Sequence, residues 1–377
     1  MHLSTLLLPL TWMDLTRGLE ILGLLRQPLS NISDQIPCVQ NTTSTLEDVV
    51  ACFDAYTVPE GYYSNATYVA AQPNVEQLQD WEELVSSLLF VDGNCTSIIV
   101  PTSIAEIYNV SLFTDTAGPE YCVASEFTSI DGVYAKGWGL FVVPATRNAV
   151  LRDIHLAAPH PAYDLLTPEQ AGALFKSTGA RSLLISGRIR TANLAPSDCV
   201  IPSSNTTVYY KTDPAHDTAE PFFSASRTIR EWQHANDGCP AQSCAFIQMH
   251  GKGATSCPTD TMFLSSGLGR SNASVAWYTD TVDRPIKRLK THLMAAFPTW
   301  NISLPSDSDC SLTATDNVFG RLVNGIAEQL VCPDASTAEL VTGEFVHIEQ
   351  AIISRQAGVY SEWTAALLAT FAPSVGA

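Results

Sequence analysis

The sequence predicts an α/β protein, in which a mostly parallel or mixed central sheet carries helices on both faces. The main observation is that short apolar segments alternate with helix-like segments from residue 131 onward, which is the pattern of a layered α/β fold. The chain has 377 residues, 46% of them hydrophobic, which is enough for one large domain or two smaller ones. No run of about 18 apolar residues occurs, so no membrane-spanning helix is expected.

The predicted strands are short apolar segments bounded by turn residues, and the predicted helices are longer segments with an apolar face. Strands are expected at residues 139–144, 153–158, 182–186, 245–249 and 345–349. Helices are expected at residues 167–178, 222–234, 282–297 and 360–371.

Two of these helices carry terminal signals. Thr167 is expected to cap the first helix, with Pro168 at its first position and Gln170 at its third, and Gly179 to end it. Pro285 indicates that the third helix begins near that residue rather than at its apolar start.

Residues 1–130 differ in amino-acid composition from the predicted α/β core at residues 131–377. They are rich in glycosylation acceptors, serine and threonine, and they contain four cysteines. Their one clear helical pattern runs from residue 75 to residue 89. We expect this region to pack on the core or to decorate it.

The charge balance excludes some partners. The chain has 20 Lys and Arg against 38 Asp and Glu, a net charge of −18. Nucleic acids and anionic membrane surfaces need clustered positive charge, so neither is an expected partner. An acidic extracellular medium suits such a composition, because some carboxylates would be protonated there.

Ten scattered cysteines, with no CxxC pair, favour five disulfides over a zinc–thiolate site. The sequence leaves the connectivity open. Cys239 and Cys244 are close enough to pair locally, and Cys310 with Cys332 is a plausible second pair.

Eight Asn-X-Ser/Thr acceptors support secretion and N-linked glycans. Residues 3–13 resemble a short signal core, but no basic residue precedes them and no clear cleavage site follows, so an amphipathic first helix is slightly favoured. The expectation of secretion therefore rests on the cysteines and the acceptors. The acceptors are Asn31, Asn41, Asn65, Asn94, Asn109, Asn205, Asn272 and Asn301.

Polar residues follow several predicted strands, where ligands bind in open α/β sheets. His160 and Asp164 follow the strand at 153–158, and His250 ends the strand at 245–249 before a glycine-rich segment. Two imidazoles and a carboxylate are a common ligand set for catalytic zinc, which keeps a fourth position for water. Each segment alone is explained as well by an ordinary turn. His155 is a rival ligand, but its place inside a strand favours a core histidine.

Two further strand ends offer catalytic groups. Glu349, at the end of the strand at 345–349, could move a proton, or could simply pair with Arg355; Glu344 precedes this strand and is the weaker candidate. Arg188 and Arg190 follow the strand at 182–186 and could stabilise an oxyanion or bind a substrate carboxylate. A solvated turn explains these arginines equally well.

The order of these segments resembles the N-formylglutamate amidohydrolase superfamily, which shares its fold with the zinc carboxypeptidases. The matching segments span roughly residues 137–355. They are GWGLFVVP, PHPAYDLLTPEQAGALF, GARSLLISGRIRTAN, DPAHD, FIQMHGKG, FLSSG, TDNVFGR and FVHIEQAIISR.

The resemblance implies a zinc carboxypeptidase-like fold with an N-terminal disulfide-bonded extension, and one zinc ion per chain. Relatives often supply Glu where this chain has Asp164, and Lys252 replaces an apolar residue, so the reaction class carries over better than the substrate. The resemblance implies that His160, Asp164 and His250 bind the zinc. It also implies that Glu349 is the general base and that Arg190 polarises the substrate carbonyl. The implied substrate contacts are Asn193, His216 and Asn317, and we add Arg188 as a further candidate.

The sequence thus predicts a secreted zinc-dependent hydrolase that cleaves an amide bond in an N-acyl amino acid or peptide-like substrate. An esterase would use the same groups. Two histidines and a carboxylate also form the site of iron oxygenases, but those sites usually lie on antiparallel barrels. No GxSxG motif supports a serine hydrolase. A non-catalytic secreted binding glycoprotein is the remaining alternative, and metal content separates it from the hydrolase.

Overall fold

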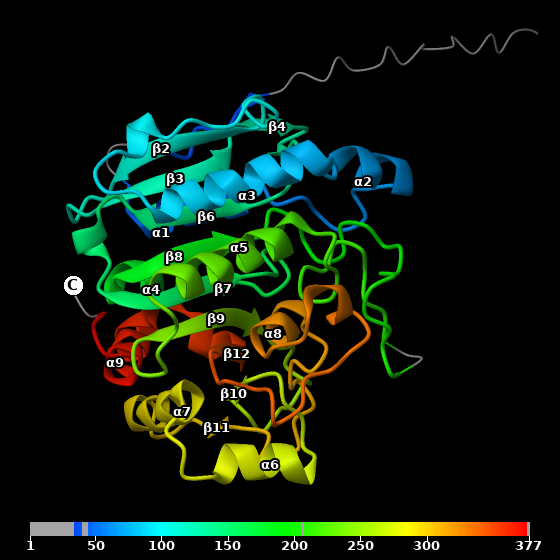
Figure 1. The fold of residues 1–377 in the computed structure, drawn as a ribbon, viewed down its shortest axis with the longest axis vertical. Coiled ribbons are helices and arrows are strands. Elements are labelled where there is room, and N and C mark those ends of the chain that lie inside the picture. Colours follow the sequence, from blue (N-terminus) through cyan, green and yellow to red (C-terminus); the bar gives the residue numbers. More distant parts are fainter. Residues whose placement is uncertain (1–33, 40–43, 205–206, 375–377) are drawn as a thin grey trace, which may run out of the picture. The chain divides into compact units, whose positions relative to one another are not determined.

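The computed structural model describes residues 34–39, 44–204 and 207–374, and a nine-stranded sheet forms their centre (Figure 1). Across the sheet the strands are β11 (Ile302–Ser303), β10 (Met262–Ser265), β12 (Phe345–Gln350), β9 (Cys244–Gly251), β7 (Arg152–Ala158), β8 (Ala180–Ile185), β6 (Leu140–Pro144), β3 (Glu120–Glu126) and β2 (Tyr108–Thr114).

The sheet is mixed, with a parallel centre. Strands β12, β9, β7 and β8 are parallel to their neighbours within this group, whereas β10 on one side and β6, β3 and β2 on the other join through antiparallel pairs. The predicted α/β class with a mixed central sheet is therefore confirmed. The parallel centre matters for function, because the carboxyl ends of its strands meet at one edge.

Helices cover both faces of the sheet (Figure 1). Helices α1, α4, α7 and α9 pack into one apolar core, and α3, α5 and α8 into the other. The helices are α1 (Leu46–Asp54), α2 (Asn65–Ala71), α3 (Val75–Leu89), α4 (Thr167–Thr178), α5 (Pro221–Asn236), α6 (Asn272–Thr279), α7 (Pro285–Ala296), α8 (Val318–Val323) and α9 (Tyr360–Thr370), with short 3₁₀ turns at Cys95–Ser97, Arg147–Ala149, Glu328–Leu330, Ile352–Arg355 and Ala357–Val359.

The strands and helices predicted within the described residues all occur, with bounds that differ by only a few residues. The helix expected at residues 75–89 is α3, which begins with a capping box between Asn74 and Gln77 and buries Trp81 against the second core. Pro285 is the first residue of α7, as its missing N–H favours.

The predicted cap of α4 is wrong. Thr167 is not the residue before the helix but its first residue, and Leu166 precedes it in the left-handed conformation, with φ of 69°. The Thr167 hydroxyl donates to the carbonyl of Asp164, 2.7 Å away, so it stabilises the preceding loop instead of the helix start. The helix ends at Gly179, with φ of 63°, as predicted.

Residues 34–130 contribute strands to the same sheet as the rest of the chain. Strands β2 and β3 pair with each other, and β3 pairs with β6. Helix α1 contacts α4, and α3 contacts α5. A second, three-stranded sheet is formed by β1 (Asp34–Gln35), β4 (Thr128–Ile130) and β5 (Val133–Tyr134).

All ten cysteines are paired, as predicted. The local pair Cys239–Cys244 is confirmed, but the expected pair of Cys310 with Cys332 is wrong, because the fold brings each of them to a partner more distant in sequence. The disulfides are Cys38–Cys52, Cys95–Cys122, Cys199–Cys332, Cys239–Cys244 and Cys257–Cys310.

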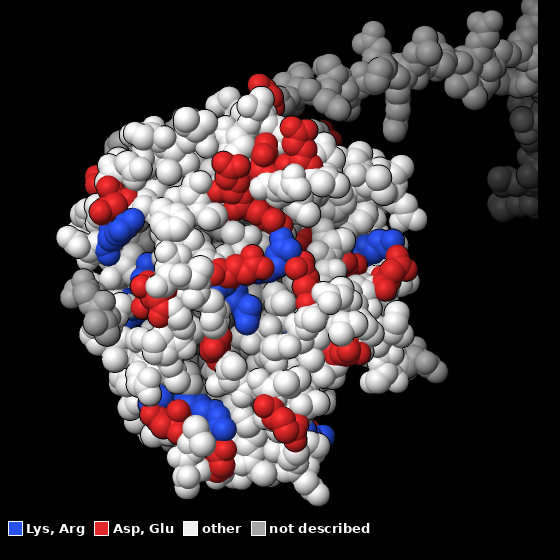
Figure 2. Space-filling model, viewed as in Figure 1, with Lys and Arg blue, Asp and Glu red and all other residues white. Residues whose placement is uncertain are grey.

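The surface carries charge of both signs. On the face in Figure 2, basic side chains lie beside acidic ones. Ion pairs of the described residues include Arg227 with Glu82 and Lys176 with Asp115. No helix among the described residues is long and apolar enough to cross a membrane.

The glycosylation acceptors within the described residues are all exposed: Asn65, Asn94, Asn109, Asn272 and Asn301. Asn31, Asn41, Asn205 and the apolar segment at residues 3–13 lie outside the described residues.

Candidate metal centre

Three neighbouring parallel strands deliver polar side chains to one edge of the sheet. His160 lies two residues beyond β7, His250 lies near the end of β9, and Glu349 lies near the end of β12. Glu349 is the register partner of His250. Residues far apart in sequence are thus adjacent because parallel strands end at the same edge.

The loop after β7 folds Asp164 back onto His160. The amide of Asp164 donates to the carbonyl of His160, 2.9 Å away, which closes one tight turn. Ala162 and Leu166, on either side of Asp164, have φ of 59° and 69°. Non-glycine residues in this left-handed region cost roughly 1–3 kcal/mol each, so the surrounding contacts must hold the loop in place.

His160, Asp164 and His250 place three ligand atoms around one point. The Nδ1 atoms of the two histidines are 3.1 Å apart, and Asp164 Oδ2 is 3.1 Å from Nδ1 of His160 and 3.4 Å from Nδ1 of His250. Zinc bonds of about 2.0–2.1 Å in a tetrahedral site separate neighbouring ligand atoms by about 3.3 Å. The observed separations match this value, and all three residues are buried.

Asp213 determines which nitrogen of His160 carries a proton. Its Oδ1 lies 3.0 Å from His160 Nε2. Burial opposes ionisation of Asp213, but the charges of Arg190, His216 and His160 hold its pKa well below the ordinary value. The ionised carboxylate accepts from Nε2–H, so Nδ1 presents its lone pair to Asp164.

The close approach of these three ligand atoms suits a cation between them. Burial lowers the pKa of His160, but the charges of Asp213 and Asp164 raise it above the ordinary value. Burial likewise opposes ionisation of Asp164, yet its contacts with His160 and His250 hold its pKa below the ordinary value. Either a proton or a metal ion satisfies the three atoms, and a set of two imidazoles and one carboxylate suits zinc among the first-row metals.

Glu349 borders a cavity of about 520 Å³ that opens onto two of the three candidate ligands, His160 and His250. This volume is that of a small-molecule site. Burial and the nearby charge of Asp164 raise the pKa of Glu349 to about 8. Arg355 donates to the carbonyl of Leu165, and Glu344 pairs with His234 at the start of β12.

The two candidate arginines are in different environments. Arg190 is half-buried at the cavity, pairs with Asp213 and lies over the ring of Tyr163. Arg188 is fully buried and pairs with Glu220. Its other N–H groups donate to carbonyls of the chain, so the structure does not bring Arg188 to the cavity, and its role is to hold loops together.

Of the three other predicted substrate contacts, two line the cavity and one does not. His216 lines the cavity, stacks on Tyr209 with ring centroids 3.6 Å apart and lies 3.0 Å from Asp213. Asn317 lines the cavity and caps α8. Asn193 is buried outside the cavity lining, and its Oδ1 accepts from the amide of Ala195.

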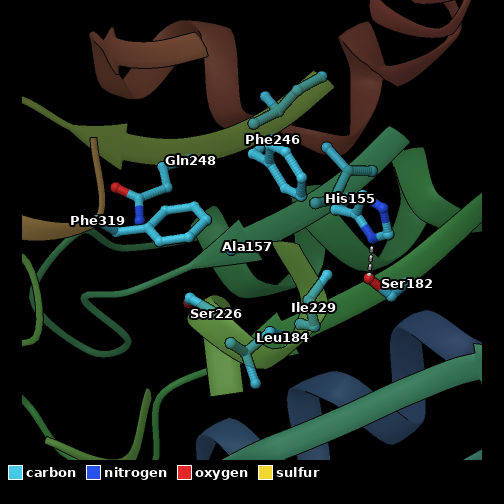
Figure 3. A pocket seen from close by; sticks show the side chains of 11 residues that line it. His155, Ala157, Ser182, Leu184, Ser226, Ile229, Phe246, Gln248 and Phe319 are labelled. Atoms are coloured by element: carbon cyan, nitrogen blue, oxygen red, sulfur yellow. Dashed lines mark hydrogen bonds between the residues drawn. The ribbon is translucent and has the colours of Figure 1, made fainter. Parts of the chain in front are cut away.

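His155 lies away from the candidate ligands. Its Nδ1 is 2.7 Å from the Ser182 hydroxyl, and its Nε2 is 3.0 Å from Gln233 Oε1. Figure 3 shows His155 directed at Ser182, inside a cavity of about 20 Å³ between β7, β9 and α5. The cavity is too small for a substrate, so His155 is a core histidine.

Sequence reasoning missed three residues near the ligands. Asp213 lies in the segment DPAHD, of which only His216 was singled out; His347 lines the cavity, two residues before Glu349; and Gln248 contacts His250. The alternation of a strand was the available signal for the last two, because residues two apart point to the same face.

No family model and no curated protein matches the sequence. Among solved structures, the chain is similar to a putative carboxypeptidase A from Shewanella denitrificans OS-217, with a TM-score of 0.32 and 11% identity over 76% of this chain and 66% of that chain, slightly under two thirds of its length. It is also similar to a succinylglutamate desuccinalase from Vibrio parahaemolyticus, with a TM-score of 0.33 and 14% identity. That match covers 70% of this chain and 76% of the other. A third similar structure is a putative metallopeptidase from Shewanella amazonensis SB2B, with a TM-score of 0.27 and 11% identity. That match covers 79% of this chain and 92% of the other. These values assign neither a family nor an activity to this chain.

Proposed function

We propose that this protein is a zinc-dependent hydrolase that cleaves an amide bond in a small N-acyl amino acid or peptide-like substrate. The observation that carries the proposal is the convergence of His160, Asp164 and His250 on one point, at the wall of a cavity that Glu349 also borders. The resemblance of the sequence segments to the N-formylglutamate amidohydrolase superfamily supports the same reaction class.

Each residue then has a defined task. When bound, zinc supplies Lewis acidity, which makes water a nucleophile near neutral pH. The charge of a bound zinc would favour the ionised form of Glu349 over the neutral form that its pKa of about 8 favours without metal. The carboxylate of Glu349 then accepts a proton as water adds to the carbonyl carbon, and it returns that proton to the leaving nitrogen when the C–N bond breaks. The products are a carboxylic acid and an amine.

Arg190 stabilises the negative charge that develops on the carbonyl oxygen. Its guanidinium is held by Asp213 and Tyr163, so it does not need to reorganise when that charge forms. Hydrolysis of an ester would use the same groups, and the rates on amides and on matching esters distinguish the two reactions.

We also propose that the protein is secreted and glycosylated. Five disulfides and exposed acceptors such as Asn65 and Asn272 support this assignment. A drop in mass after treatment of the secreted protein with an N-glycosidase would support the glycans, and an unchanged mass would contradict them.

The proposed reaction is tested with Glu349→Gln and with Glu344→Gln, a matched control on a residue beside the opposite end of β12. Wild type should contain about one zinc per chain and hydrolyse members of a panel of N-acyl amino acids, dipeptides and matching esters. Glu349→Gln should keep the zinc and lose about 10²–10⁴-fold in rate, the usual contribution of a general base. Glu344→Gln should stay near wild type.

Two results would contradict the proposal. A wild-type protein that holds no metal after zinc is added back would remove the metallohydrolase mechanism and leave a binding glycoprotein. A Glu349→Gln variant as active as wild type would remove Glu349 from the reaction.

A further inference from the structure

A buried amide, Gln248, lies behind the His250 ligand on strand β9. Its side-chain oxygen is 3.4 Å from Nε2 of His250 and 2.7 Å from Nδ2 of Asn317. Gln248 and Asn317 are 1% and 2% exposed, so these contacts are shielded from solvent. The sequence singled out Asn317 as a substrate contact, but its amide group faces Gln248.

The orientation of Asn317 is fixed by the backbone. The amide of Gly320, which can only donate, lies 2.8 Å from Asn317 Oδ1 at the start of α8. Oδ1 is therefore the end of the Asn317 amide that faces the helix, and Nδ2 is the end that faces Gln248.

The orientation of Gln248 follows from that of Asn317. Because Nδ2 of Asn317 is a donor, the atom 2.7 Å away must be an acceptor, which is Oε1 of Gln248. The Nε2 group of Gln248 then borders the small cavity with His155 and Phe319 (Figure 3). At about 20 Å³ that cavity is no ligand site, so the amide has a structural or positioning role.

The tautomer of His250 follows in turn. An acceptor opposite Nε2 favours a proton on that nitrogen, which leaves the lone pair of Nδ1 directed at His160 and Asp164. The contact of 3.4 Å is longer than the usual range of about 2.7–3.2 Å, so it is a weak hydrogen bond in this structure. Asp213 likewise accepts from Nε2 of His160, so the Nε2 atom of each candidate ligand histidine faces its own acceptor.

We propose that Asn317 and Gln248 form a positioning chain that starts at the Gly320 amide and sets the tautomer and ring orientation of His250 for metal binding. This inference rests on the proposed metal centre. Acceptors behind a metal-ligating histidine typically change metal affinity by about 10–100-fold, so Gln248 is a positioning residue whose effect is on affinity rather than on the reaction itself.

The test compares three variants by competition of each protein with a zinc-binding dye. Gln248→Met has a similar volume but no acceptor, and its zinc Kd should rise about 10–100-fold. Gln248→Glu keeps an acceptor and should stay within about threefold of wild type, because rescue by an acceptor is what the inference requires. Gln233→Met is the matched control, since Gln233 is a buried amide behind His155; it should lower Tm and leave the zinc Kd unchanged.

A second measurement reads the tautomer itself. In protein with ¹⁵N-labelled histidine, the His250 ring should show a protonated Nε2 in wild type and in Gln248→Glu, and a mixture in Gln248→Met. Equal zinc Kd values for Gln248→Met, Gln233→Met and wild type would overturn the inference, as would a wild-type His250 protonated at Nδ1. A wild type that binds no zinc but keeps the Nε2–H tautomer would overturn the proposed function and leave the positioning chain standing.

Discussion

Two buried histidines, His155 in β7 and His160 in the loop that follows it, lie five residues apart and have different surroundings. His155 lies in the interior of β7, where its two ring nitrogens meet the neutral side chains of Ser182 and Gln233. His160, just beyond β7, meets the carboxylates of Asp164 and Asp213. Burial, followed by the charge of Arg181, lowers the pKa of His155 to about 3, whereas the carboxylates raise that of His160.

The comparison shows that burial and residue type do not identify a ligand histidine. Both rings are at least 95% buried. Both nitrogens of each ring have a partner, and the difference is that the partners of His155 are neutral side chains, whereas those of His160 are two carboxylates, with His250 Nδ1 3.1 Å from His160 Nδ1. We therefore expect substitutions at His155 to change stability, and substitutions around His160 to change metal binding and activity.

The largest expected effect is on activity. His250→Ala should reduce amide hydrolysis by at least about 10²–10³-fold, because it removes a proposed zinc ligand and with it the metal that would activate water. His155→Phe should keep wild-type activity once folded. Initial rates on the best substrate of the panel, measured with excess zinc, check both, and equal losses in the two variants would break the comparison.

The next effect is on stability. His155→Phe keeps a ring against Phe246 but removes the bonds to Ser182 and Gln233, which leaves buried polar atoms without partners. The free energy of unfolding should fall by about 2–3 kcal/mol at pH 7.5. Urea unfolding measures it, and a loss below about 0.5 kcal/mol would show that these bonds contribute little.

A smaller effect is expected at Asp213. Asp213→Asn keeps the shape of the side chain but weakens the acceptor behind His160, so zinc affinity should fall about 10–100-fold. Dye competition measures it, with Asp217→Asn as a nearby carboxyl control. An unchanged zinc Kd for Asp213→Asn would show that His160 does not depend on this carboxylate.

The smallest effect is a pH dependence at His155. Its folded pKa of about 3 is below the ordinary value of 6.5, so the unfolded chain takes up a proton below pH 6.5 that the folded chain does not. Wild type therefore loses stability as pH falls, and His155→Phe lacks this loss. The deficit of the variant should shrink by about 1.4 kcal/mol between pH 7.5 and pH 5.5. A constant deficit would contradict the low pKa.

The sequence predicts the central elements well because their signals are local. Apolar runs mark β7, β9 and β12, and the polar residues at their ends, His160, His250 and Glu349, meet because the strands are parallel. The strands β2 and β3 were not predicted, since their segments lack a motif and their place in the sheet depends on pairing with β6.

The rest of the site depends on tertiary contacts. Arg188 and Arg190 look alike in the sequence, yet one is buried against Glu220 and the other lines the cavity. Asp213 comes from a loop whose position relative to His160 no local pattern determines. The pairing of Cys310 with Cys257 is likewise set by the approach of distant segments.

The zinc content of purified wild type, His250→Ala and His155→Phe tests the central claim most directly, because it requires no knowledge of the substrate. We predict about one zinc per chain in wild type and in His155→Phe, and none in His250→Ala. Zinc retained by His250→Ala, or absent from a wild-type protein to which zinc has been added back, would contradict the assignment of the metal centre.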